Sequence, residues 1–222
     1  MKNRIVHSPV GITLVAGGKV KSAHLAIAMA FAPILVAADK GAVTAVKAGY
    51  MPQAVIGDFD GAKTDLADLV PIERLHQITT QDSTDFEKCL SHIAAPFIIA
   101  LGATGSRLDH SLAAMNAVAK NPQHRLVLLS GKDLCFLCPP GFEIKLPKGT
   151  RLSLFPMTRM NGTSKGLKWP IDGLDFSPLG TIGTSNQTTG SDVLLNFDTS
   201  GMLVILPQKH LAAVIAALTR GD

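Results

Sequence analysis

The sequence predicts an α/β protein: an N-terminal domain with a mainly parallel, Rossmann-like sheet, followed by a smaller all-β sandwich domain. In roughly the first 130 residues, short β-branched runs alternate with longer alanine-rich runs, which is typical of strand–helix units around a parallel sheet. After about residue 141 the helix-like runs stop, and Pro, Gly, Asn and Ser separate short apolar segments. We therefore expect two domains, residues 1–135 and 136–222.

The elements of the first domain follow from apolar runs and helix formers. The expected strands cover residues 12–16, 34–38, 54–56, 74–78, 97–101 and 126–129. The expected helices lack internal Gly and Pro and cover residues 21–31, 42–48, 84–94 and 108–120. Asp82, Ser83 and Thr84 are all suitable caps for the third of these helices. Residues 210–220 predict a C-terminal helix.

The overall composition indicates a compact protein with a small anionic ligand. Hydrophobic residues make up 46% of the 222 residues and charged residues 17%, which argues against disorder. The net charge of +4 comes from scattered basic residues with no run of five or more. This pattern suits a small anion better than a long phosphate backbone, so we expect no nucleic-acid partner.

Cysteine use and hydropathy predict a cytoplasmic protein. Cys89, Cys135 and Cys138 are too few and too uneven in number to form a disulfide scaffold. Cys135 and Cys138 have redox or zinc spacing, but in a strand they would point to opposite faces, which favours buried thiols. The apolar run 25–38 is shorter than the ~20 residues of a membrane span and is divided by Pro33. We expect neither export nor a membrane partner.

Polar residues and glycines follow four of the predicted strands. Ligands of open α/β sheets bind outside the carboxyl ends of the strands, where these residues would meet. The residues concerned are Gly17 and Gly18, Asp39, Asp58 and Asp60, and the segment 102–109. We therefore expect the ligand site at this edge of the sheet.

The stretch Gly57-Asp58-Phe59-Asp60-Gly61 has two interpretations. Gly and Asp tolerate turn geometry, so the stretch is compatible with a simple acidic turn. Along an extended chain, however, both carboxylates would face one side while Phe59 packs on the other. Two carboxylates on one side suit Mg²⁺, which takes such ligands together with phosphate oxygens and waters.

Two further segments carry charged groups at helix starts. Residues 81–88 are compatible with an exposed capping cluster, but they also add Asp82 and Asp85 to the acidic residues. Residues 101–110 form a glycine-rich loop that contains Arg107, Asp109 and His110. Free backbone N–H groups and the arginine fork in such a loop favour a phosphate. His110 is a helix-end contact, a substrate neighbour or a packed imidazole.

These segments together resemble one known family. The motifs, in chain order, are Ala38-Asp39-Lys40-Gly41-Ala42, Gly57-Asp58-Phe59-Asp60, Asp82-Ser83-Thr84-Asp85-Phe86-Glu87-Lys88, Gly105-Ser106-Arg107-Leu108-Asp109-His110, Ser164-Lys165-Gly166-Leu167-Lys168-Trp169-Pro170 and Gly183-Thr184-Ser185-Asn186. In this order and context they are similar to the motifs of the thiamine pyrophosphokinase family. The sequence departs from that family at Lys40, where Gly is usual, and at Gly61, where Ser is usual.

The resemblance implies transfer of a diphosphate group from ATP to the hydroxyl of thiamine, giving thiamine diphosphate and AMP, with Mg²⁺ as cofactor. It also implies a homodimer whose active sites are shared between subunits. The implied metal ligands are Asp58, Asp60 and Asp85. The implied catalytic residues are Asp58, Asp60, Asp82, Asp85, Arg107 and Asp109. The implied ATP-binding residues are Asp39, Lys40, Gly41, Gly105, Arg107 and His110, although for Lys40 the favoured interpretation is a solvent-facing side chain.

For thiamine, the resemblance implies contacts from Trp169, Ser185 and Asn186. A single tryptophan in a β domain is otherwise more often a core residue, but an aromatic face can stack on a flat pyrimidine and attract a cationic thiazolium. Asp109 or Asp82 is the expected base for the hydroxyl. The alternatives are a diphosphokinase for another heterocyclic, pterin-like alcohol and a non-catalytic thiamine or nucleotide sensor on the same fold.

Overall fold

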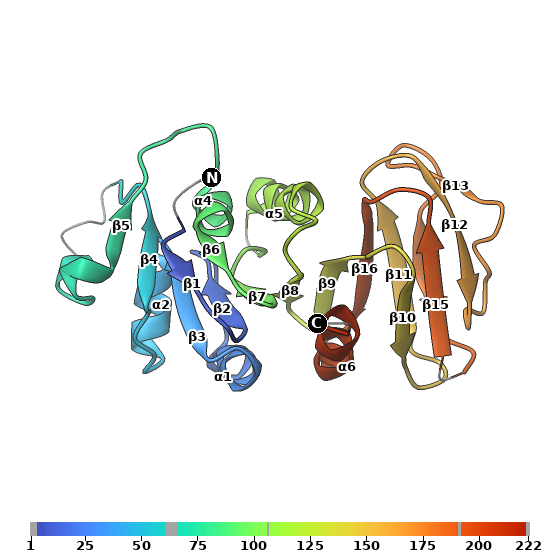
Figure 1. Cartoon of the computed structure of the whole chain (residues 1–222), viewed down its shortest axis with the longest axis horizontal. Coiled ribbons are helices and arrows are strands. Elements are labelled where there is room, and N and C mark those ends of the chain that lie inside the picture. Colours follow the sequence, from blue (N-terminus) through green and yellow to red (C-terminus); the bar gives the residue numbers. More distant parts are fainter. Residues whose placement is uncertain (1–3, 61–65, 106, 191, 221–222) are drawn as a thin grey trace. The chain divides into compact units, whose positions relative to one another are not determined.

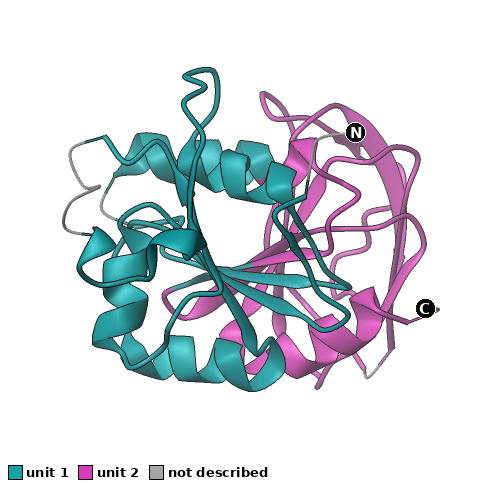
Figure 2. Ribbon diagram, turned by 60° about the vertical axis from the view of Figure 1, so that its left-hand side comes forward, with its two compact units in different colours: residues 1–117, 128–130 teal, residues 118–127, 131–222 magenta. Residues whose placement is uncertain are grey.

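The computed structural model describes residues 4–60, 66–105, 107–190 and 192–220 (Figure 1). The chain divides into two compact units, residues 1–117 with 128–130 and residues 118–127 with 131–222 (Figure 2). The first unit combines helices and strands, and the second consists mainly of strands.

The sheet of the first unit follows the predicted strands closely. Its strands lie in the order β8-β7-β2-β3-β4-β5. Their bounds are β2 (Ile12–Val15), β3 (Ile34–Ala38), β4 (Ala54–Gly57), β5 (Leu75–Gln77), β7 (Ile98–Leu101) and β8 (Leu126–Ser130). The pairs β7-β2, β2-β3, β3-β4 and β4-β5 are parallel. The carboxyl ends of these strands therefore meet at one edge of the sheet.

Burial explains why these strands are apolar throughout. All residues of β2, β4 and β7 are buried, as expected for a parallel sheet that helices cover on both faces (Figure 2). The hydroxyl of Thr13, in the middle of β2, donates a 2.7 Å hydrogen bond to the Ala32 carbonyl, which satisfies this buried polar group. The described helices of this unit include α1 (Ser22–Phe31), α2 (Gly41–Lys47), α4 (Asp85–His92) and most of α5 (Leu108–Lys120).

The third predicted helix begins as expected but ends early. Thr84 is its N-cap and forms a capping box with Glu87, so Thr84 and not Asp82 or Ser83 is the cap. The expected end at residue 94 is wrong, because Ile93 and Ala94 form strand β6, which pairs in parallel with β1 (Val6–His7). Pairing with a distant segment overrides the helical tendency of these two residues.

The second unit is built from antiparallel strand pairs. One sheet has the order β10-β15-β12-β13, with β10 (Phe142–Lys145), β15 (Asp192–Phe197), β12 (Met160–Lys165) and β13 (Asp175–Phe176). The strands β14 (Gly183–Gln187), β11 (Arg151–Pro156), β16 (Met202–Pro207) and β9 (Asp133–Leu137) pair in that order.

The core of the second unit lies between these two sets of strands. Burial alternates along β10 and β15, so one face of their sheet is apolar. Phe142 of β10 contacts Phe136 of β9, with the ring centroids 5.2 Å apart. The C-terminal helix begins as the 3-10 turn η2 (Gln208–His210) and continues as α6 (Leu211–Leu218), slightly shorter than predicted.

The three cysteines are buried, as the sequence predicts, and form no disulfide with one another. Burial raises the pKa of the Cys135 thiol to about 12 and also raises that of Cys138, so both are neutral and unreactive at physiological pH. In the parts of the chain that the structure describes, no helix combines the length and apolar character that a membrane span requires.

Candidate functional site

A pocket of about 380 Å³ lies at the carboxyl ends of the strands of the first unit. The loops after β2, β3 and β7 and the starts of α4 and α5 line it, which is the position that the strand ends predict. The lining residues are Ala16, Gly17, Gly18, Ala38, Asp39, Lys40, Thr84, Asp85, Phe86, Gly102, Ala103, Thr104, Gly105, Arg107, His110, Ala113 and Ala114.

Glycines allow the backbone segments around this pocket to approach one another closely. The Gly18 N–H donates a 2.9 Å hydrogen bond to the Gly102 carbonyl, and a Cβ at Gly18 would lie only 2.4 Å from that oxygen. A Cβ at Gly41 would lie 2.1 Å from the Val15 carbonyl oxygen. Neither position accepts a side chain without moving backbone, so the glycines set the shape of the pocket wall.

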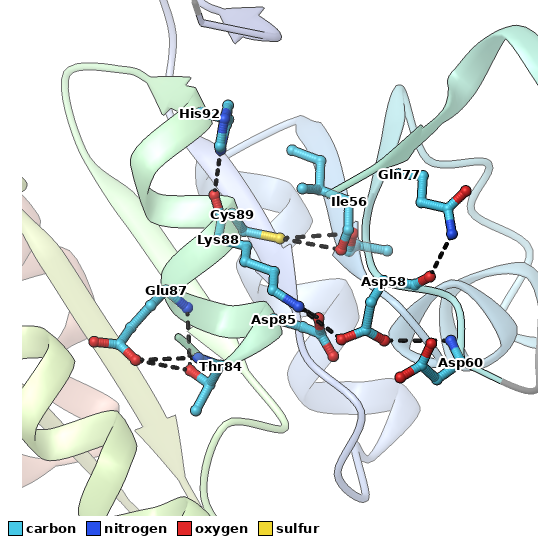
Figure 3. Close-up of polar contacts among 11 residues, drawn as sticks. Ile56, Asp58, Asp60, Gln77, Thr84, Asp85, Glu87, Lys88, Cys89 and His92 are labelled. Carbon is cyan, nitrogen blue, oxygen red and sulfur yellow. Dashed lines mark hydrogen bonds and ion pairs between the residues drawn. The ribbon is translucent and has the colours of Figure 1, made fainter. Parts of the chain in front are cut away.

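An acidic cluster next to the pocket is organised by a buried lysine (Figure 3). The Lys88 ammonium donates to Asp58 Oδ2 at 2.7 Å and to Asp85 Oδ1 at 3.0 Å. Asp58 follows β4, and Asp85 and Lys88 lie on α4, so the lysine connects two elements. The Asp60 N–H donates to Asp58 Oδ1 at 3.2 Å, which places the two acids side by side.

The backbone between Asp58 and Asp60 differs from the prediction. Phe59 is buried, as expected, but its φ of 60° is left-handed, so the expectation of an extended chain through these residues is wrong. An aspartate that accepts a hydrogen bond from the N–H two residues on forms a turn of its own, and this turn brings the acids together. Left-handed backbone at a residue other than glycine is strained and clusters at functional sites.

The charges in the cluster shift one another's pKa values. The hydrogen bond from Lys88 lowers the pKa of Asp58. Burial on its own would lower the pKa of Lys88, but the hydrogen bonds to Asp58 and Asp85 outweigh it and the pKa is raised. Burial, and then the negative charge of Asp85, raise the pKa of Asp39. The Asp58 and Asp85 carboxylates and the Lys88 ammonium thus lie near a third acid, Asp39, whose pKa burial raises.

The acidic residues fit a divalent cation together with a phosphate ligand. Asp39, with φ of 44°, has a buried Oδ1 for which the described residues supply no hydrogen-bond partner. Within the described residues, no group of three His, Cys, Asp or Glu side chains forms a ready-made metal site. Mg²⁺ usually takes only one or two carboxylates and completes its shell with waters and phosphate oxygens, and Asp58 and Asp85 suit that arrangement.

The glycine-rich loop after β7 presents a paired arginine. Arg107 Nε and Nη2 donate to the two oxygens of Asp109 at 3.1 and 2.5 Å, and both side chains are exposed. This pair raises the pKa of Arg107 and lowers that of Asp109. Ser111, which the sequence motifs do not indicate, accepts from the Gly105 N–H and donates to the Arg107 carbonyl, so it holds the loop against α5.

The predicted site residues do not all meet at the pocket. Gly41 is buried and is not among the described residues that line the pocket, whereas Lys40 is exposed and lines it. Of the predicted acids, Asp39 and Asp85 line the pocket, whereas Asp58, Asp60, Asp82 and Asp109 are not among the described residues that line it. Asp82 is exposed. Ser106 and Gly61, which belong to or follow the quoted motifs, lie outside the described residues.

In the second unit, the predicted thiamine contacts form a separate group. Trp169 is 52% exposed and therefore not a core residue. Asn186 is buried, accepts a hydrogen bond from the Trp169 N–H at 3.2 Å and donates to the Trp169 carbonyl at 2.6 Å. The Lys168 ammonium lies 4.5 Å from the centroid of the Trp169 ring. Ser185 has a left-handed φ of 62°, and its N–H donates to Ser153.

Two family models match this chain, one mainly in the first unit and one in the second. Residues 26–128 match the family model described as thiamin pyrophosphokinase, catalytic domain. Residues 142–202 match the one described as thiamin pyrophosphokinase, vitamin B1 binding domain. The two matches together cover more than half of the chain.

Several curated relatives carry the same name. Thiamine pyrophosphokinase 1 of Oryza sativa subsp. japonica is 30% identical over 172 residues, which cover 69% of this chain but 65% of the relative, slightly less than two thirds of its length. Thiamine pyrophosphokinase 2 of Arabidopsis thaliana is 29% identical over 182 residues, 72% of this chain and 67% of the relative. Thiamine pyrophosphokinase of Bacillus subtilis (strain 168) is 26% identical, with 76% and 84% covered.

Solved structures support the same assignment at the level of the fold. Thiamin pyrophosphokinase from Candida albicans superposes with a TM-score of 0.73 at 17% identity, over 91% of this chain and 93% of that one. The yeast thiamin pyrophosphokinase gives a TM-score of 0.72 at 17% identity, over 99% and 95%. Since a catalytic-domain match and a vitamin B1 binding-domain match follow one another along a fold of the same kind, the chain belongs to the thiamin pyrophosphokinase family.

Proposed function

We propose that this protein is a thiamine diphosphokinase, which transfers the diphosphate group of ATP to the hydroxyl of thiamine and releases AMP. The acidic cluster beside a glycine-lined pocket carries this proposal. Asp58 and Asp85 offer carboxylate oxygens, Asp39 has a buried oxygen without a hydrogen-bond partner among the described residues, and glycine-rich loops line the pocket. Such a pocket suits a polyphosphate that is bound with divalent cations.

The residues of the pocket and of the neighbouring acidic cluster divide two tasks in this proposal. Asp39, Lys40, Gly41, Gly105, Arg107 and His110 bind ATP, and Asp58, Asp60 and Asp85 hold Mg²⁺. A cation bound there neutralises phosphate charge and stabilises the charge that develops at the attacked phosphorus. Because AMP leaves, the pocket must hold ATP with its β-phosphorus in line with the thiamine hydroxyl.

Asp82 and Asp109 are the candidate bases for the thiamine hydroxyl. Arg107 binds both oxygens of Asp109 and lowers its pKa, which makes this carboxylate a weaker proton acceptor. Asp82 has no such arginine partner in the described contacts and is exposed at the start of α4. We therefore favour Asp82 as the base.

The second unit supplies the thiamine site in this proposal. Trp169 would stack on the thiamine pyrimidine with the ring face opposite to Lys168, while Ser185 and Asn186 shape the surroundings. We propose a functional division into residues 1–135, a Rossmann-like catalytic domain, and residues 136–222, a thiamine-binding β-sandwich. A cytoplasmic homodimer, with each site shared between subunits, completes the proposal.

Product analysis tests the proposed reaction directly. The protein is incubated with ATP, Mg²⁺ and thiamine, and the products are identified by mass spectrometry. We expect thiamine diphosphate and AMP in equal amounts, without ADP. Product from a pterin-like alcohol but not from thiamine would identify a different acceptor, and thiamine binding without turnover would identify a sensor.

Replacing Arg107 by Lys is expected to weaken ATP binding by roughly tenfold, because an ammonium keeps the charge but loses the planar pair of donors that matches two phosphate oxygens. Calorimetric titration with ATP and Mg²⁺ measures this change. Lys47→Met, at an exposed site at the end of α2, is the control for a general loss of positive charge. Normal ATP dependence in the Arg107→Lys protein would place this residue outside the site.

Replacing Asn186 by Ala is expected to weaken thiamine binding without changing ATP binding. The buried amide bonds the N–H and the carbonyl of Trp169, so its loss releases the segment that presents the indole. Leaving these groups unsatisfied should also lower the free energy of unfolding by about 1–3 kcal/mol. Asn161→Ala, which removes an exposed amide bonded to Asp198, is the matched control. Unchanged thiamine affinity would show that Asn186 does not position Trp169.

A further inference from the structure

Lys88 is the least exposed charged residue near the acidic cluster, and the implied roles of the family motifs leave it without a function. Its side chain is 2% exposed. Lysines are almost never this buried unless an opposite charge pairs with them. Here one ammonium serves two carboxylates, because Nζ lies 2.7 Å from Asp58 Oδ2 and 3.0 Å from Asp85 Oδ1.

The position of the ammonium is set by the packing of α4. This helix packs against β3 and β4. The next residue, Cys89, is fully buried, and its Sγ lies 3.8 and 3.7 Å from the carbonyl oxygens of Ala37 and Ile56 in those strands. The lysine stem therefore starts from a fixed point above the sheet and reaches the strand ends with little freedom (Figure 3).

The lysine engages only one oxygen of each carboxylate. It binds Oδ2 of Asp58 and Oδ1 of Asp85, so Oδ1 of Asp58 and Oδ2 of Asp85 are not its ligands. A cation site at these two acids would use those second oxygens. Without a positive charge between them, the two carboxylates would repel each other in a partly buried place, since their side chains are 18% and 30% exposed.

We propose that Lys88 is a positioning residue, an internal counterion that holds Asp58 and Asp85 together while no divalent cation is bound. The inference rests on the proposed function, since it takes these acids as cation ligands. Lys88 does not touch the substrate in this proposal. It keeps the two cation ligands on different elements at a fixed separation, so that the site is already assembled when the cation arrives with the nucleotide.

The test is the thermal stability of Lys88→Met with and without Mg²⁺, in the absence of thiamine and nucleotide. Methionine keeps the length and the apolar stem but removes the charge. Without divalent cation, we expect the melting temperature to fall by about 10 °C relative to the unchanged protein. Saturating Mg²⁺ should restore roughly half of this loss or more, because it replaces the missing positive charge, while the unchanged protein gains much less.

A second variant separates charge compensation from packing. In Lys88→Met combined with Asp85→Asn, one of the two negative charges is gone, so the melting temperature without cation should lie above that of Lys88→Met, and the response to Mg²⁺ should shrink. Lys47→Met, which removes an exposed lysine from the same unit, should melt like the unchanged protein under both conditions.

Several results would overturn the proposal. An equal loss of stability with and without Mg²⁺ would make Lys88 a packing residue only, and a normal melting temperature in both conditions would give it no role in the cluster. If Lys88→Met does not fold, the double variant decides, and its failure to fold as well would also indicate packing. The melting experiments contain no acceptor and no nucleotide. Their outcome is therefore independent of the product analysis that tests the proposed reaction.

Discussion

Replacing Asp58 or Asp60 by Asn is expected to lower turnover by about a hundredfold or more, because each change removes a carboxylate that would hold the cation at the site of developing charge. Steady-state formation of AMP with saturating ATP and thiamine measures the effect. The two variants should differ in stability. Asp58 is the partner of the buried Lys88, whereas Asp60 is exposed, so Asp58→Asn should also lower the melting temperature and Asp60→Asn should not.

Asp68→Asn is the matched control for this pair, since Asp68 is an exposed aspartate of the same unit and, in the described contacts, has no bond to the acidic cluster around Lys88. It should keep normal turnover and stability. Melting curves must show that both site variants are folded at the assay temperature. Near-normal turnover in folded Asp58→Asn and Asp60→Asn proteins would remove these acids from the cation site.

Replacing Trp169 by Ala is expected to weaken thiamine binding by about tenfold or more, because stacking and the buried area of the indole are both lost. The indole is 52% exposed, so truncation should affect ligand binding more than folding. Trp169→Phe should recover much of the affinity, since a smaller ring still stacks. Titration with thiamine measures the change, and ATP affinity measured without thiamine should stay the same.

Mixing two impaired proteins, at a thiamine concentration that does not saturate the Trp169→Ala protein, tests whether the sites are shared between subunits. A Trp169→Ala chain and an Asp58→Asn chain are combined under conditions that exchange subunits. In a shared-site heterodimer one site carries both defects and the other carries neither, so activity should rise on mixing. A confirmed heterodimer without any recovery would argue that each chain builds its own site. Unchanged thiamine affinity in Trp169→Ala would contradict the stacking role itself.

Much of the fold follows from local patterns in the sequence. Strand β3 and helix α5 have the predicted bounds, and the other predicted strands of the first unit differ by a residue or two, whereas β1 and β6 were not predicted. Parallel strands that are buried on both faces appear in the sequence as short apolar runs. Helices appear as longer segments without internal Gly or Pro. Both kinds of element can therefore be recognised from sequence. The placement of acids and glycines after strands also predicts where the pocket lies, since the carboxyl ends of parallel strands meet at one edge.

Contacts between residues that are far apart in the sequence could be identified only from the tertiary structure. Ile93 and Ala94 pair with Val6 and His7 and leave the helix that their own neighbours favour. The alternating acids predict an extended chain at Asp58 and Asp60, but Phe59 has a left-handed φ. The burial of the Phe59 ring and the turn that Asp58 forms with the Asp60 N–H favour this conformation over the extended one.

The candidate site shows the same division. The motifs predict functional roles for Asp58, Asp85 and Trp169 from their residue types and their order along the chain. The motifs alone do not show that Lys88 bridges Asp58 and Asp85. They also do not show that Asn186 bonds the backbone of Trp169. Each contact joins segments that only folding brings within hydrogen-bond distance. The sequence by itself therefore indicates which residues are candidates for the site. Packing decides which charges are paired and how the side chains are oriented.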